Sequence, residues 1–78
     1  MPSQLILSVD HSVNLAVIHT PPGAAQFLAS SLDHANLTGV IGTIAGDDTI
    51  ILVSKKATGG ANLAKELLAY ARGDGKRR

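Results

Sequence analysis

Two adjacent carboxylates, Asp47 and Asp48, lie between two apolar runs in the stretch GTIAGDDTIILV, residues 42–53. The segment AGDD is typical of a turn, because glycine and aspartate adopt turn conformations readily, so the stretch predicts a β-hairpin. A turn requires only one of the two aspartates, and neighbouring anions repel each other. A cation would relieve this repulsion, and a guanidinium suits best because its planar fork pairs bidentately with a carboxylate. The residues alone leave two interpretations open: turn formation, or a site for a cationic ligand.

A second group of polar residues falls on a predicted helix. Gln26, Ser30 and Asp33 are spaced by four and three residues, which places them on one helical stripe. This stripe is either a solvated face or part of a site. His19 ends an apolar run, where a lone histidine is either a hydrogen-bonded structural group or a base or ligand. No metal site is predicted, because three scattered histidines without a cysteine do not form a convincing ligand set.

The apolar runs predict four strands, which pair as two hairpins. The expected strands cover residues 4–9, 14–20, 40–44 and 49–53, with turns at Asp10–Ser12 and Ala45–Asp48. In the second strand, Leu15, Val17 and His19 alternate with Ala16 and Ile18, as expected for the two faces of a sheet.

A helix is expected after each hairpin. The first follows TPPG, residues 20–23, with Thr20 as its cap and Phe27 and Leu28 on its apolar face. The second follows Thr58, its expected cap. Its apolar stripe comprises Leu63, Ala64, Leu67, Leu68 and Ala71.

The element order is β-β-α-β-β-α, which predicts an α+β fold of two layers: a four-stranded sheet with two helices on one face. One domain is expected over residues 1–72, and residues 73–78 are expected to form a flexible basic tail. Isoleucine and valine occupy both faces of the strands, although the helices cover only one. The bare sheet face, or the helix edges, is therefore expected to contact another subunit.

The composition also favours a homo-oligomer. The 78 residues are 45% hydrophobic and 17% charged, against about 25% charged residues in an average soluble domain. A chain this short has a thin core and no cysteine for a disulfide, so association is the remaining common means of stabilisation.

Charge and hydropathy exclude other classes of partner. The formal net charge of +1 is too small to indicate nucleic-acid binding by this chain. No apolar run approaches the roughly 20 residues of a membrane helix, so no membrane contact is expected. The lack of cysteine is compatible with the cytoplasm, where we expect the protein to act.

Two stretches together closely resemble the C-terminal domain of the bacterial arginine repressor family. They are VIHTPPGAAQFLASSLD, residues 17–33, and GVIGTIAGDDTIILV, residues 39–53. The resemblance extends from about Gln4 to Ala71. It implies a domain that forms homo-trimers, two of which stack into a hexamer, with L-arginine bound as corepressor at the trimer–trimer interface.

The resemblance also implies which residues bind arginine. In the family, the first helix and the TIAGDD hairpin surround the ligand. The corresponding positions here are Gln26, Asp33, Thr43, Ala45, Asp47 and Asp48. Carried over, the two hairpin aspartates meet the guanidinium, while Asp33, Gln26 and the main chain near Ala45 contact the amino-acid end. His19 matches a family position near the site. No metal and no cofactor besides the ligand arginine is implied.

The function that the resemblance implies is an L-arginine-sensing, hexamer-forming core of a transcriptional repressor of arginine biosynthesis and catabolism genes. The family reads operator DNA through an N-terminal winged helix-turn-helix, which has no counterpart in these residues, so DNA contact is expected only through that domain.

Two other functions are alternatives to this one. The first is a small oligomeric enzyme that uses interface carboxylates in acid–base chemistry, for which no nucleophile or metal shell is evident. The second is a purely structural trimerisation domain, which leaves the paired aspartates without a purpose beyond the turn.

Overall fold

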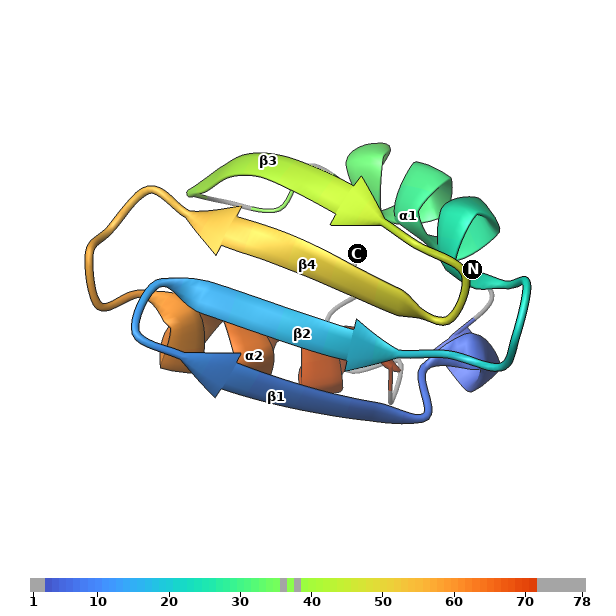
Figure 1. The fold of residues 1–78 in the computed structure, drawn as a ribbon. Coiled ribbons are helices and arrows are strands. Elements are labelled where there is room, and N and C mark those ends of the chain that lie inside the picture. The colour runs from blue at the N-terminus through green and yellow to red at the C-terminus, as the bar shows by residue number, and fades with distance from the viewer. Residues whose placement is uncertain (1–2, 36, 38, 72–78) are drawn as a thin grey trace.

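A computed structural model describes residues 3–35, 37 and 39–71 as a sheet covered by helices (Figure 1). The strands are β1 (Ser8–Ser12), β2 (Leu15–His19), β3 (Val40–Ala45) and β4 (Thr49–Ser54). The helices are α1 (Ala25–Asp33) and α2 (Gly60–Ala71), and a 3-10 turn, η1 (Ser3–Leu5), precedes β1. The expected tail, residues 73–78, lies outside the described residues.

The four strands form one antiparallel sheet in the order β1-β2-β4-β3. Each hairpin supplies one edge strand and one central strand, and the hairpins join where β2 pairs with β4. Helix α2 packs against β1 and β2, and α1 packs against β3 and β4, on the same side of the sheet (Figure 1). The predicted two-layer α+β fold is confirmed.

The core lies between the two central strands and the helices. Ile18 of β2 pairs with Ile50 of β4, Ala16 pairs with Leu52, and all four side chains are buried. The helices cover them with the buried side chains Ala25, Leu28, Ala29, Leu32, Leu63, Ala64 and Leu67. Burying a large aliphatic side chain contributes about 1.5–3 kcal/mol, so this small set accounts for most of the apolar stabilisation of the subunit.

The other side of the sheet, which we call the open face, is also apolar. Its side chains include Leu15, Val17, Ile44, Ile51 and Val53. Val17, Ile51 and Ile44 pair in register and form a row across β2, β4 and β3. Ile44 is 71% exposed and Ile51 is 36% exposed in the single chain. A contiguous apolar row of this kind is typical of surfaces that contact another molecule.

The first strand was predicted in the wrong place. β1 covers Ser8–Ser12, whereas the sequence placed a strand over residues 4–9 and a turn at Asp10–Ser12. His11, interpreted as a turn residue, lies within β1. An edge strand with one solvated side accepts polar residues, so turn-forming residue types did not mark a turn here.

The turn of the first hairpin is imposed by its surroundings. It lies at Val13 and Asn14, and Val13 has a φ of 46°, which β-branched residues rarely adopt. The Gly60 N–H donates to the Val13 carbonyl and the Ser54 N–H donates to the Asn14 carbonyl, both at 2.8 Å. Contacts with α2 and β4 therefore hold a conformation that the local sequence does not favour.

The helices also differ from prediction in detail. Phe27, predicted on the apolar face of α1, is 62% exposed, because the buried stripe follows Ala25, Leu28, Ala29 and Leu32. Helix α2 begins at Gly60 instead of directly after Thr58. The Gly59 carbonyl accepts the Leu63 N–H at 3.0 Å, so Gly59 occupies the capping position expected for Thr58.

Gly60 brings α2 close to the first hairpin. A Cβ atom at this position would lie 2.5 Å from the Leu15 carbonyl oxygen and 2.9 Å from that of Val13. Both obstructing atoms belong to the main chain, so they cannot move aside as a flexible side chain would. By contrast, a Cβ atom at Gly46 would meet only the Thr49 carbonyl, at 3.7 Å.

We predict opposite effects of alanine at these two glycines. Gly60→Ala should lower the free energy of unfolding by about 1–3 kcal/mol, the usual cost of overpacking, although alanine favours helices. Gly46→Ala should be neutral or raise stability by up to about 1 kcal/mol, because it restricts the unfolded chain. Urea denaturation at one protein concentration without ligand measures both values. Equal stabilities of the two variants would contradict the close approach at Gly60.

Candidate functional site

The tip of the β3–β4 hairpin carries the two adjacent aspartates. β3 ends at Ala45, one residue later than the sequence predicted, and β4 begins at Thr49, as predicted. The Gly46 N–H donates to the Thr49 carbonyl at 2.8 Å, which closes the turn around Asp47 and Asp48. Both aspartates are exposed. The hairpin thus presents two neighbouring carboxylates to solvent at one end of the sheet.

Main-chain hydrogen bonds tie this tip to the segment that leads into α1. The Asp47 carbonyl accepts the Gly23 N–H at 3.0 Å and the Ala25 N–H at 3.2 Å. The Asp48 carbonyl accepts the Thr20 N–H at 2.8 Å. The first N–H groups of a helix have no partner within the helix, and here the hairpin carbonyl satisfies that of Ala25.

The expected cap of α1 is therefore wrong. The N-cap residue is Ala24, which has no side-chain cap, and Thr20 instead donates its hydroxyl to the Pro21 carbonyl at 2.9 Å. The main-chain oxygens of the hairpin fulfil the capping role, so the aspartate side chains are not needed for it. Turn formation uses the main chain of the pair and leaves both carboxylates available.

Four of the other predicted site residues line the seam between α1 and β3. The Gln26 amide donates to the Ala45 carbonyl at 3.3 Å, close to the hairpin tip. Asp33 and Thr43 line the same cleft of about 170 Å³ between the end of α1 and β3. We call these four residues, Gln26, Asp33, Thr43 and Ala45, the α1–β3 seam.

The seam has acidic groups towards both ends. Gln26 and Asp33 are seven positions apart on α1, a rise of about 10 Å. Because Gln26 lies beside the hairpin strand and Asp33 at the far end of α1, the seam runs from the paired aspartates to a third carboxylate. A ligand that carries a positive charge at each end matches this arrangement. Gln26, Asp33, Asp47 and Asp48 are all exposed, so a ligand here would be only partly covered by one chain.

His19 lies apart from the seam. It is exposed at the end of β2 and pairs with Ser8 and Thr49. Since Ile18 points into the core, the side chain of His19 lies on the open face, whereas Gln26 and Asp33 belong to the helix layer. The structure therefore groups Gln26, Asp33, Thr43 and Ala45 between α1 and β3, with the hairpin aspartates beyond Ala45. His19 lies on the open face beside Thr49, its partner in β4.

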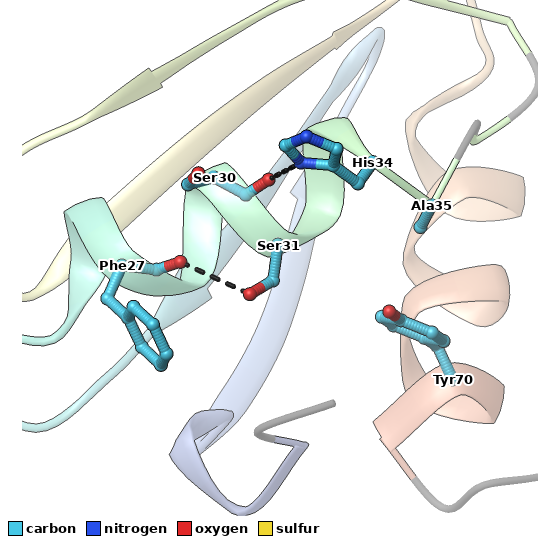
Figure 2. Close-up of a pocket in the computed structure, with 6 residues that line it drawn as sticks. All are labelled: Phe27, Ser30, Ser31, His34, Ala35 and Tyr70. Atoms are coloured by element: carbon cyan, nitrogen blue, oxygen red, sulfur yellow. Dashed lines mark hydrogen bonds between the residues drawn. The ribbon is translucent and has the colours of Figure 1, made fainter.

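A second hollow, of about 340 Å³, lies between α1 and α2 (Figure 2). Its lining comprises Phe27, Ser30, Ser31, His34, Ala35 and Tyr70. The Ser31 hydroxyl donates to the Phe27 carbonyl at 3.4 Å, and His34 Nδ1 lies 2.8 Å from the Ser30 carbonyl oxygen (Figure 2). These two side chains bond to the main chain of their own helix, and none of the described residues that line the hollow carries a carboxylate. It does not match the chemistry of the hairpin tip.

Within residues 3–35, 37 and 39–71, no three histidine, aspartate or glutamate side chains are grouped to hold a metal ion. Neither of the described α-helices has the length and hydropathy needed to cross a membrane.

Comparison with known families decides what kind of domain this is. The family model described as "Arginine repressor, C-terminal domain" matches residues 3–69. The chain belongs to the arginine repressor family. This family consists of transcription regulators and not of enzymes, so the chain is the arginine-binding core domain of a repressor. The resemblance found in the HTPPGAAQ and GTIAGDDT motifs is confirmed.

Two contributors to the site geometry were not predicted. Thr49 donates its hydroxyl to Asp48 Oδ1 at 3.0 Å. Gly23 has a φ of 83°, which lets its N–H point at the Asp47 carbonyl. The glycine after the two prolines was a detectable signal of a left-handed turn. The sequence predicted Thr49 only as the first residue of a strand, and not as a hydrogen-bond donor to Asp48.

We predict that the conformation of Gly23 contributes to the docking of the hairpin tip. Gly23→Ala should destabilise the domain by about 1–2 kcal/mol, because a side chain disfavours the left-handed region. Gly23→Asn should cost less, since asparagine tolerates positive φ. Urea denaturation without ligand gives the stabilities, and hydrogen exchange at the Thr20 and Ala25 amides reports the docking itself. Faster exchange in Gly23→Ala than in Gly23→Asn is expected, and equal exchange in the two variants would contradict the role of Gly23.

Proposed function

We propose that this chain senses L-arginine and forms a hexamer from two trimers, as the core of a cytoplasmic repressor of arginine biosynthesis and catabolism genes. The observation that carries this proposal is the pair of exposed carboxylates at a hairpin tip whose main-chain oxygens are already bonded. Membership of the arginine repressor family makes arginine the ligand to consider first.

In the proposed complex, Asp47 and Asp48 bind the guanidinium group of arginine. Carboxylate–guanidinium pairs are frequently bidentate and are stronger than hydrogen bonds between neutral groups. The bound charge also removes the repulsion between the two anions. A cation that donates several hydrogen bonds compensates the hydration energy that the carboxylates lose on binding.

The α1–β3 seam binds the amino-acid end of arginine in this proposal. Asp33 accepts from the α-ammonium group, and Thr43 can donate its hydroxyl to the α-carboxylate. The Gln26 side-chain amide is held against the Ala45 carbonyl, which fixes it near the hairpin. The family resemblance implies that His19 is near the site, and of the seven implied residues it has the least structural support, because its side chain lies on the open face.

The exposure of the seam supports a site that is shared between subunits. Binding pockets for small molecules bury about 70–90% of the ligand surface, and an open seam at the sheet edge covers less than that. A second subunit placed over the seam would complete the enclosure. This agrees with arginine binding at the trimer–trimer interface, as the family resemblance implies.

The open face supports a second contact, within the trimer. Its apolar row lies on the side of the sheet away from the helices, so both contacts can form at once. Operator DNA would be bound through an N-terminal winged helix-turn-helix of the kind found in the family. The net charge of +1 gives this chain little of the phosphate attraction on which DNA affinity depends.

Replacing either hairpin aspartate by asparagine should weaken arginine binding while the domain stays folded. Asparagine keeps the turn chemistry and the shape but loses the charge. A hydrogen bond to a charged group contributes about 1.5–3 kcal/mol, so the dissociation constant should rise by roughly one to two decades. Titration calorimetry of Asp47→Asn and Asp48→Asn measures the change.

Two controls accompany this titration. Glu66→Gln removes one negative charge from an exposed position of α2 and should leave the affinity unchanged. Citrulline, which has the shape of arginine without its charge, should bind the unmodified chain poorly. If both asparagine variants bind arginine as tightly as the unmodified chain, the aspartates serve only the turn.

A lysine on the open face should dissociate the trimer without unfolding the subunit. Ile51→Lys places a charge in the middle of the apolar row, where it remains hydrated only in the separated chain. Leu68→Lys is the matched control, because Leu68 of α2 is 38% exposed and Ile51 is 36% exposed. Sedimentation at micromolar concentration should show trimers or hexamers for the unmodified chain and the control, and smaller species for Ile51→Lys. Trimers formed by Ile51→Lys would place the subunit contact elsewhere.

A further inference from the structure

The side chain of Asp48 is held by its neighbour in sequence. The Thr49 hydroxyl donates to Asp48 Oδ1 at 3.0 Å. An ionised carboxylate has about four acceptor positions on its two oxygens. One donated bond therefore leaves the second oxygen and one position on the first for a ligand.

The main chain around Asp48 is already fixed on both sides. Its carbonyl accepts the Thr20 N–H at 2.8 Å, and the Thr49 carbonyl accepts the Gly46 N–H at 2.8 Å. The preceding carbonyl, of Asp47, accepts two further N–H groups. With the peptide groups held in this way, rotation of the side chain is the main freedom that Asp48 retains. The Thr49 hydroxyl restrains this rotation.

The two aspartates are not equivalent in this respect. The Asp48 carboxylate accepts a hydrogen bond from the Thr49 hydroxyl. Within the described part of the chain, no side chain donates a hydrogen bond to the Asp47 carboxylate. Thr49 begins β4, where a β-branched residue suits the extended backbone. Valine would meet that requirement equally well and has nearly the same shape. The Thr49 hydroxyl is therefore not required for the formation of β4.

Orientation of a carboxylate matters most for a planar ligand group. A guanidinium donates two parallel N–H bonds only when the carboxylate lies in the same plane, whereas an ammonium group acts as a compact charge with rotatable donors. A carboxylate with a fixed plane loses less rotational freedom when the guanidinium binds. Restraint of Asp48 thus favours a guanidinium ligand over an ammonium ligand.

We propose that Thr49 is a positioning residue of the arginine site, which orients the Asp48 carboxylate for bidentate binding of a guanidinium. This role deepens the proposed function and rests on it. Thr49 contributes to affinity through Asp48, with no requirement that its own hydroxyl touches the ligand.

The test compares Thr49→Val with Thr49→Ser in titrations with L-arginine. Valine removes the hydroxyl and should raise the dissociation constant by about two- to tenfold, which corresponds to the loss of one ordinary hydrogen bond. Serine keeps the hydroxyl and should restore the dissociation constant to within about twofold of the parent value. Thermal unfolding without arginine should be similar for both variants, since the strand and its main-chain bonds are retained.

A double-mutant cycle separates positioning from a merely structural role. Thr49→Val is combined with Asp48→Ala, which leaves no side-chain acceptor for the Thr49 hydroxyl. The titrations are made at roughly a hundredfold higher arginine concentration to match the weaker binding expected of that background. If Thr49 acts through Asp48, the valine substitution should have no further effect there. An equal loss in both backgrounds would overturn the proposal, because Thr49 would then act on another part of the site.

The outcomes distinguish this proposal from the proposed function. If the parent chain does not bind arginine, both the proposed function and the positioning role of Thr49 are wrong. If the parent binds arginine and Thr49→Val binds equally tightly, only the positioning role is wrong. If Thr49→Ser is as weak as Thr49→Val while both remain folded, the hydroxyl is not responsible and the proposal is also overturned.

Discussion

Three main-chain hydrogen bonds join the β3–β4 hairpin tip to the segment between β2 and α1, and the arrangement of the site depends on them. The donors are the N–H groups of Thr20, Gly23 and Ala25, and the acceptors are the carbonyls of Asp47 and Asp48. These bonds fix the start of α1 against β4 and β3, which sets the seam along which Gln26 and Asp33 face the hairpin. At the other end of the sheet, the two halves of the chain are joined by the bonds from Gly60 to Val13 and from Ser54 to Asn14.

The same bonds separate the roles of main chain and side chain at the tip. The carbonyl groups satisfy N–H donors that would otherwise lack partners, which stabilises the subunit irrespective of any ligand. The carboxylates take no part in this docking and stay exposed to solvent. A main chain that is held by its surroundings while its charged side chains face solvent suits a binding site for an oppositely charged group.

The general fold could be predicted because two periodicities in the sequence are clear. Alternation in β2 and β4 and the helical spacing of Leu28, Leu32, Leu63 and Leu67 specify which faces are buried. The polar edge strand β1 was misplaced, since Asp10 and Ser12 are turn formers whose strand conformation comes from pairing with β2. Val13 was equally unpredictable, because its left-handed conformation is imposed by bonds from α2 and β4.

The local sequence pattern predicted the hairpin of the candidate site with its two aspartates. The family motifs identified the other candidate site residues. The adjacency of Asp47 and Asp48 is visible in the sequence, whereas the docking of their carbonyls on the α1 start depends on tertiary structure. The hydrogen bond from Thr49 to Asp48 involves neighbours in sequence, yet it depends on a rotamer that no sequence pattern specifies. Residue types could therefore suggest a cationic ligand, but not which carboxylate is held in place.

A site at the edge of a small, apolar subunit has a consequence for regulation in the proposed assembly. A ligand that binds only where two subunits meet stabilises their association by mass action. The effect grows as the ligand concentration rises above its dissociation constant. By reciprocity, the associated form binds the ligand more tightly than the separated trimers do. The open face and the α1–β3 seam lie on different sides of the subunit, so an apolar contact can hold the trimer while a charged contact at the seam responds to the ligand. This division would let arginine concentration control the second contact alone and leave the subunit fold and the first contact unchanged.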